Sequence, residues 1–188
     1  MAFWRDAEIE PKRKFRFQVQ LGTSADSVLW WAKTVNTPSF DVSETEHDFF
    51  DNKYYFPGRV TWTEVTVTLV DPISIDAVAQ TNAILQNSGY LVKTKTQGTG
   101  DGTAKTISKN KAVTDGGLIN FMIEVLDAEG VVVESWKLNN PFIKSAKFDD
   151  FDYSSDDLRG LELTVRYDWA TCDTNGNTKS TNSGTFFE

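Results

Sequence analysis

Apolar and polar residues alternate along most of the chain, and this period of two predicts β-strands. In "KFRFQVQL" the apolar positions share one side of an extended segment and are Phe15, Phe17, Val19 and Leu21. The segment "VLWWAKTV" follows after the turn-like "GTSADS", so we expect the two segments to form a hairpin. Near the C-terminus "LELTVRYDWA" alternates in the same way and places on one side Leu161, Leu163, Val165, Tyr167 and Trp169.

The stretch "YYFPGRVTWTEVTVTLVDP", residues 54–72, predicts a long strand because Val, Thr and Trp favour a pleated sheet. Its apolar residues change parity midway, from Val60 and Trp62 to Val65, Val67 and Leu69. One additional residue near Thr63 and Glu64 would return both groups to one side of the strand, which predicts a β-bulge there.

One α-helix is expected at about residues 72–88. Asp71 can accept hydrogen bonds from the free N–H groups of a first turn, and Pro72 suits the first helical position. Gly89 can end the helix in a left-handed conformation. The expected inner face combines positions three and four apart and consists of Ile75, Val78, Ala79, Asn82 and Leu85.

The remaining pattern completes a mainly β fold. "LINFMIEVLD" and "GVVVESWKL" should pair across the turn at residues 127–130, and "NPFIKSAKF" predicts a further strand. About eight strands with one flanking helix indicate an antiparallel β-barrel or sandwich. The length of 188 residues predicts a single domain over residues 1–188.

Two segments do not fit the strand pattern. Residues 93–117 hold five lysines and little that could be buried, so they predict a long lysine-rich loop or an extended hairpin. Residues 171–188 are polar almost to their end, and a flexible C-terminal tail is expected there.

Charge and cysteine content narrow the possible partners. The chain carries 19 Lys and Arg against 27 Asp and Glu, a formal net charge of −8, which repels nucleic acid on average. Cys172 is the only cysteine, so no disulfide can form within the chain. Neither a signal peptide nor a run of about 20 apolar residues is visible, and we expect a soluble protein without a membrane partner.

Candidate catalytic groups are few. His47 is the only histidine, and neither it nor Cys172 has neighbours typical of a nucleophile and its base. A zinc site would need more nitrogen and sulfur ligands than the chain provides. The glycines of "GTGDGTAKT" lack the spacing of a phosphate-binding loop. We therefore expect no enzyme and no catalytic residue, cofactor or metal ligand.

Acidic residues form two clusters. The first comprises Asp41, Glu44, Glu46 and Asp48, and the second comprises Asp149, Asp150, Asp152, Asp156 and Asp157. Paired carboxylates could serve a glycoside hydrolase, and spaced ones could hold calcium, although the second cluster lacks the glycine and final glutamate of an EF-hand loop. A solvated acidic face is the ordinary interpretation, and a contact surface for a basic partner is the alternative.

The sequence resembles the tail-tube proteins of contractile-tailed bacteriophages. The residues that carry the resemblance are "WWAKTVNTPSF", "YYFPGRVTWTEVTVTLVDP" with the helix after it, and "FDYSSDDLRGLELTVRYDWA", within residues 14–170. The resemblance implies a β-barrel subunit, related in fold to the tube protein of type VI secretion. Six subunits would form a ring with one continuous inner barrel, and rings would stack into a tube inside a contractile sheath.

The resemblance also implies partners and a location. The partners would be other copies of the chain, the tail sheath protein, and the baseplate and tail-terminator proteins. The tape-measure protein and genomic DNA would pass through the lumen without specific binding. The protein would be part of a phage virion, assembled in the host cytoplasm. Alternatives are a same-fold baseplate or tube-initiating protein, a tube protein of a secretion or injection machine, and, more remotely, a small carboxylate-dependent hydrolase.

Within such a tube, several residues acquire expected positions. Thr66 and Thr68 would face the lumen, because their valine and leucine neighbours would pack beneath the helix, and an acidic lumen would repel DNA. A charged contact between rings, or between tube and sheath, would join the lysine-rich segment to the second acidic cluster. The lysines concerned are Lys93, Lys95, Lys105, Lys109 and Lys111, and the carboxylates are Asp149, Asp150, Asp152, Asp156 and Asp157.

Overall fold

A computed structural model describes residues 10–20, 32–74, 76–90, 106–115, 118, 120–154, 156–174, 176 and 184–187. The chain is mainly β, as expected. Its first half contains β1 (Phe17–Gln20), β2 (Ala32–Val35), β3 (Phe40–Phe49), β4 (Asn52–Trp62), β5 (Val65–Val70) and α1 (Ala77–Asn87). Its second half contains α2 (Lys109–Thr114), β6 (Met122–Leu126), β7 (Val132–Asn139), β8 (Phe142–Phe148), β9 (Gly160–Arg166), β10 (Trp169–Asp173) and β11 (Thr185–Phe186).

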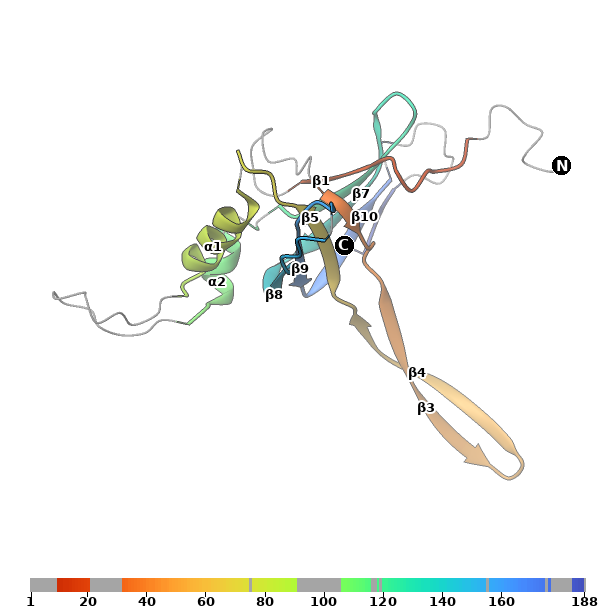
Figure 1. The fold of residues 1–188 in the computed structure, drawn as a ribbon. Helices are drawn as coiled ribbons and strands as arrows, with labels where there is room; N and C mark the ends of the chain where they lie inside the picture. Colours follow the sequence, from red (N-terminus) through yellow and green to blue (C-terminus); the bar gives the residue numbers. More distant parts are fainter. Residues whose placement is uncertain are drawn as a thin grey trace.

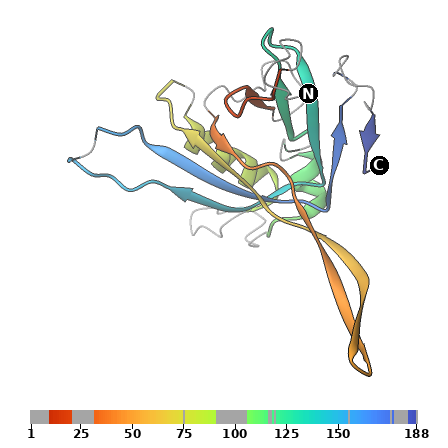
Figure 2. The ribbon, with the colours of Figure 1, turned by 90° about the vertical axis from the view of Figure 1, so that its right-hand side faces the viewer.

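Two antiparallel sheets enclose the core. The first has the strand order β1-β6-β7-β10-β11 and the second the order β2-β5-β9-β8. Alternate residues of β5 and β9 are buried on the inner side, as the period of two predicts, and they meet inner residues of the first sheet such as Ile123 and Leu138. The described sheets are open rather than closed into a barrel within one chain (Figure 2).

Helix α1 covers the second sheet but begins later than expected. Its N-cap is Asp76, whose carboxylate accepts a hydrogen bond from the N–H of Ala79 at 2.8 Å. Asp71, the expected cap, instead accepts from the N–H of Ala77 at 3.0 Å. Gly89 ends the helix region with φ of +103°, as expected. The described buried or half-buried residues of α1 that face the core are Ala77, Thr81, Ile84 and Leu85.

The predicted inner face of α1 is therefore partly wrong. Ala79 and Asn82 are exposed, whereas Thr81 is buried because its hydroxyl donates to the Ala77 carbonyl at 2.8 Å and so needs no water. Ile75 lies outside the described residues. A second, six-residue helix, α2, stands where a loop or hairpin was expected within residues 93–117. The described residues thus contain two helices rather than one.

Three strand predictions also need correction. The first two predicted strands do not form a hairpin, because β1 pairs with β6 and β2 pairs with β5 in the other sheet. The parity change at Thr63 and Glu64 is a break between β4 and β5, which belong to different sheets, and not a bulge. Trp169 is 43% exposed and starts β10, so it does not share the buried side of β9.

The second predicted hairpin is confirmed, whereas the predicted flexible tail is wrong in part. Strands β6 and β7 pair across the turn at residues 127–130, where Gly130 has φ of +81°. The expected tail is partly in the sheet, since residues 171–173 end β10 and the short strand β11 pairs with β10. Among the described residues, no helix is long and apolar enough to cross a membrane.

The third sheet is a long two-stranded hairpin, β3 and β4, which we call the arm (residues 40–62). Its strands have 10 and 11 residues and pair only with each other. Figure 1 shows the arm extending away from the two packed sheets and from the helices. Every residue of the arm is exposed except the half-buried Trp62 at its root.

Candidate assembly surfaces

The arm contains a register shift between Val42 and Glu44. Here Ser43 faces two residues of β4, Gly58 and Arg59, and its hydroxyl accepts from the N–H of Arg59 at 2.8 Å. A side chain at Gly58 would place its Cβ 2.3 Å from this hydroxyl oxygen and 3.0 Å from the Ser43 carbonyl oxygen, so Ser43 would have to move. The extra residue moves β4 by one position relative to β3, which changes the side to which its following residues point.

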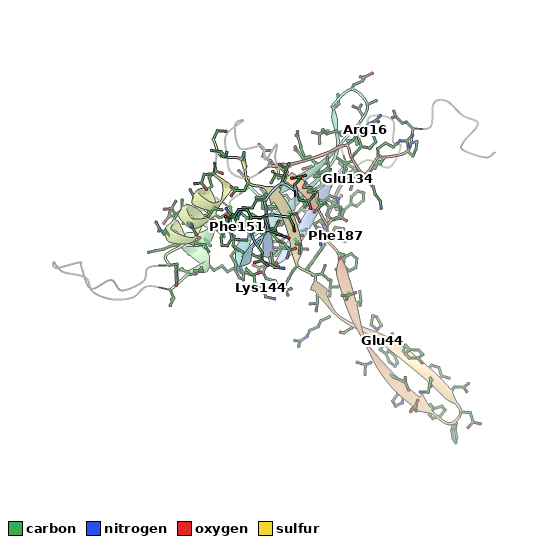
Figure 3. The ribbon with its side chains drawn as sticks, viewed as in Figure 1. Arg16, Glu44, Glu134, Lys144, Phe151 and Phe187 are labelled. Atoms are coloured by element: carbon green, nitrogen blue, oxygen red, sulfur yellow. The ribbon has the colours of Figure 1, made fainter. Side chains whose placement is uncertain are left out.

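The two sides of the arm differ chemically as a result. Because paired residues of an antiparallel ladder point to the same side, one side carries Val42 and Val60 near the root and then three carboxylates. These are Glu44, Glu46 and Asp48, of which Glu46 pairs with Lys53 (Figure 3 labels Glu44). The other side carries near its tip the apolar or aromatic residues Phe49, Tyr54 and Phe56, with His47 among them.

The tip of the arm exposes an aromatic pair. Phe49 and Phe50 meet edge to face with ring centroids 4.7 Å apart, and Phe50 is 89% exposed. Phe50 also has φ of +55°, a conformation that costs energy for a residue with a Cβ. Exposure of a large apolar side chain to water is unfavourable, so we interpret the tip as a surface that contacts another molecule.

An apolar groove lies at the root of the arm. It has a volume of about 370 Å³ and is lined by Phe40, Val60, Trp62, Trp169 and Phe187. The Phe187 ring follows β11 and packs edge to face on Trp62 at 5.5 Å and on Phe40 at 5.6 Å between ring centroids. Figure 3 shows Phe187 beside the root of the arm. The C-terminal residues thus attach the arm to the first sheet.

The second sheet has two unpaired edge strands, β2 and β8, among the described residues. Unpaired edges present backbone N–H and C=O groups that can join another chain. The N–H of Asp149 donates to Gly160 of β9 at 3.2 Å. Since successive residues of a strand direct their N–H groups to opposite sides, that of Phe148 points to the free edge.

The outer side of the second sheet is polar and nearly balanced in charge. Thr66 and Thr68 lie on it, in line with Thr34 of β2 and with Glu162 and Thr164 of β9. Its carboxylates are matched by cations: Glu162 lies opposite Lys147, and Glu64 contacts Lys144 and Arg166 at 2.5 and 3.7 Å. The acidic lining expected for the side that bears Thr66 and Thr68 is therefore wrong.

The negative charge lies elsewhere. Residues 40–62 contain five acidic and two basic residues, and residues 149–157 contain five acidic residues and no basic one. These two segments together account for the whole net charge of −8, since the remaining acidic and basic residues are equal in number. The excess of acidic residues therefore lies in the arm and in the loop between β8 and β9.

The loop between β8 and β9 is held by its own hydrogen bonds and by Arg159. The Asp149 carboxylate accepts from the N–H of Gly160 at 2.8 Å, and Arg159 donates to Asp71 at 3.2 Å. The Arg159 guanidinium also lies over the Phe151 ring, 4.7 Å from its centroid. Hydrogen bonds to Asp152 from the backbone and side chain of Ser154 hold the pKa of Asp152 below its ordinary value, so it is ionised at neutral pH.

The structure describes two of the five predicted lysines, Lys109 and Lys111. Lys109, in α2, forms its ion pair with Asp168, outside the acidic loop. Lys111 follows on the same short helix. The other predicted lysines, Lys93, Lys95 and Lys105, lie outside the described residues. A contact between the two charged segments thus remains a prediction about separate copies of the chain.

His47 and Cys172 lie in different sheets. Cys172 is buried in β10, and this burial raises the pKa of its thiol, whereas His47 is exposed on the arm. Among the residues that the structure describes, no group of three or more His, Cys, Asp or Glu could hold a metal ion. Sequence reasoning missed the arm and its groove. The available signal was the segment "FFDNKYYF", residues 49–56, whose aromatic residues are too densely placed around a polar turn to pack together into one core.

Several solved structures have this fold. A chain from the tube-terminating cap of the anti-feeding prophage matches with a TM-score of 0.61 at 22% identity, over 93% of this chain and 99% of that chain. A chain from the baseplate of the same prophage matches with a TM-score of 0.61 at 13% identity, over 87% and 96%. A chain from the extended sheath-tube complex of an extracellular contractile injection system matches with a TM-score of 0.58 at 17% identity, over 93% and 99%.

No protein-family model and no curated protein matches the sequence. At these identities the structural matches establish the fold. The resemblance to tail-tube proteins is thereby confirmed at the level of the fold, which this chain shares with tube assemblies of contractile injection systems.

Proposed function

We propose that this chain is a structural subunit that joins copies of itself into the rings of a hollow tube. The observation that carries the proposal is the second sheet, which is buried on one side and has both edge strands unpaired among the described residues. Pairing β8 of one copy with β2 of the next would satisfy these edges and extend one sheet around a ring. The shared fold with chains of tube assemblies supports this role over that of an enzyme.

In such a ring, one side of the second sheet would face the channel. The buried side of β5 and β9 lies under α1, so the opposite side, with Thr66 and Thr68, faces the channel. The hydroxyl groups and matched charges of this side make a wall that neither binds nor strongly repels a passing polymer. Six copies per ring, as the resemblance implies, would close the sheet into a continuous barrel.

The assembly that we favour is the inner tail tube of a contractile-tailed phage. In it the partners are the sheath, baseplate and tail-terminator proteins, and the tape-measure protein and genomic DNA pass through the channel. The sequence resemblance supports this assignment. A tube, cap or baseplate component of an injection system is the second candidate, favoured by the folds matched in the anti-feeding prophage.

Ring closure is tested by one substitution at the free edge. Phe148→Pro removes the N–H group that points away from β9 and should leave the protein monomeric, whereas Phe148→Ala keeps this N–H group and should still form rings. Sedimentation velocity gives the mass of each species, and negative-stain microscopy shows whether it is annular. A parent protein that stays monomeric at all concentrations, or a Phe148→Pro variant that forms rings, would contradict the proposal.

A further inference from the structure

The arm's tip and distal side have apolar surface that the chain itself does not cover. Phe49, Tyr54 and Phe56 are between 49% and 57% exposed, and Phe50 is more exposed still. The strands that carry them pair only with each other. A hairpin of two strands is at best marginally stable in water, so an arm of this length needs a partner surface to stay ordered.

The groove at the root of the arm is suited to phenyl rings. It already holds the Phe187 ring against Phe40 and Trp62 in edge-to-face geometry, which is favourable for aromatic pairs. A cavity of about 150 Å³ is enough for one benzene ring. The remaining volume of about 370 Å³ therefore has room for the two rings of the arm tip.

An arm cannot reach its own groove. The groove is at the root, and the 10 residues of β3 carry the tip roughly 34 Å away at about 3.4 Å per residue. The distance excludes the chain's own tip, whereas the identical tip of a second copy is not limited in this way.

We propose that Phe49 and Phe50 of one copy occupy the groove lined by Phe40, Val60, Trp62, Trp169 and Phe187 of a second copy. The two contacting surfaces differ, so the contact is heterologous and each copy can both give an arm and receive one. Applied to the proposed tube, on which this inference partly rests, the contact joins successive rings with a spacing set by the arm length.

The contact can be trapped with cysteines. Phe50→Cys and Trp169→Cys variants are mixed in equal amounts and oxidised, and a covalent dimer is expected from the mixture. Each variant alone, and the parent with its buried Cys172, should remain uncrosslinked. Absence of a dimer from the mixture, or an equal yield of tip-to-tip dimer from Phe50→Cys alone, would overturn the proposal.

A second comparison separates this contact from ring closure. Phe49→Ser with Phe50→Ser should leave rings intact and weaken their association at least tenfold, whereas Phe15→Ser, which alters a 74% exposed ring outside the arm, should not. Rings of the double variant that stack like the parent would overturn the arm contact and leave ring closure standing. A mixture that crosslinks without forming rings would support the arm contact and contradict ring closure.

Discussion

Tyr167 combines a buried ring with a polar atom that the core does not accommodate. Only 3% of the residue is exposed, and its hydroxyl has no hydrogen-bond partner among the described residues. Its ring packs against Trp62, 6.1 Å away between centroids, at the root of the arm. Burial of the hydroxyl disfavours the phenolate and raises the pKa of Tyr167 to about 12.

This pKa predicts a loss of stability in alkali. An unfolded tyrosine releases its proton near pH 10, whereas folded Tyr167 keeps its proton to about pH 12. Between these values the unfolded state binds fewer protons, so stability that is fully present below pH 10 falls as the pH rises. The urea midpoint of the parent should therefore drop more between pH 9 and pH 11 than that of Tyr167→Phe. Equal drops in the two proteins would show that Tyr167 does not contribute.

At the scale of single elements, the arm depends on one glycine. Gly58→Ala would bring a methyl group against the Ser43 hydroxyl and disturb the register shift that sets the two sides of the arm. Because the arm contributes no residue to the buried core apart from the half-buried Trp62, the unfolding free energy should change by no more than about 0.5 kcal/mol. The association of rings through the arm should nevertheless weaken, while the rings themselves still form.

The measurement pairs thermal unfolding with sedimentation of the Gly58→Ala protein. Thr61→Ala, on the same strand but outside the register shift, serves as the matched control and should assemble normally. A Gly58→Ala protein that assembles like this control would show that the register shift is dispensable.

Strands that cover the core could be predicted, because alternating apolar and polar residues identify a strand with one buried and one exposed side. Val65, Val67 and Leu69 are buried as the alternation indicates. The parity change after Trp62 was ambiguous, since a bulge and a strand that moves to another sheet produce the same sequence pattern. The arm could not be predicted, because its alternation describes two solvent-facing sides and does not say that a core is absent.

The helix shows a different limit. Gly89 was a clear stop because a left-handed residue is needed there. The start was not clear, because Asp71 and Asp76 both bind N–H groups of the first turn, and only the geometry shows which one caps the helix. The inner face was misjudged where a threonine satisfies its own hydroxyl at a buried position.

At the scale of the whole molecule, the charge divides into two acidic segments and a neutral remainder. If the acidic loop meets the lysine-rich segment of another ring or of the sheath, many weak ion pairs would add around the ring. Raising the salt concentration from about 0.05 to 0.5 M shortens the screening length several-fold and should shorten assembled tubes. Tube lengths in micrographs measure this effect.

Asp150→Asn with Asp152→Asn supplies the control for the salt series. Both carboxylates are exposed, so their replacement should leave the fold intact and make tube length less dependent on salt. Tubes of the parent that keep one length at all salt concentrations would argue against the charged contact. The apolar contact of the arm tip is not expected to weaken in salt.

The separation of tip and groove along one hairpin gives any stack of these copies a direction. One terminus of the stack would present bare aromatic hairpins, and the opposite terminus would present vacant hollows of tryptophan and phenylalanine. A single kind of cap could not close both. Initiation would require a protein that offers a hollow or a substitute ring pair, termination would require its chemical complement, and elongation would be free to proceed from whichever terminus was left uncapped.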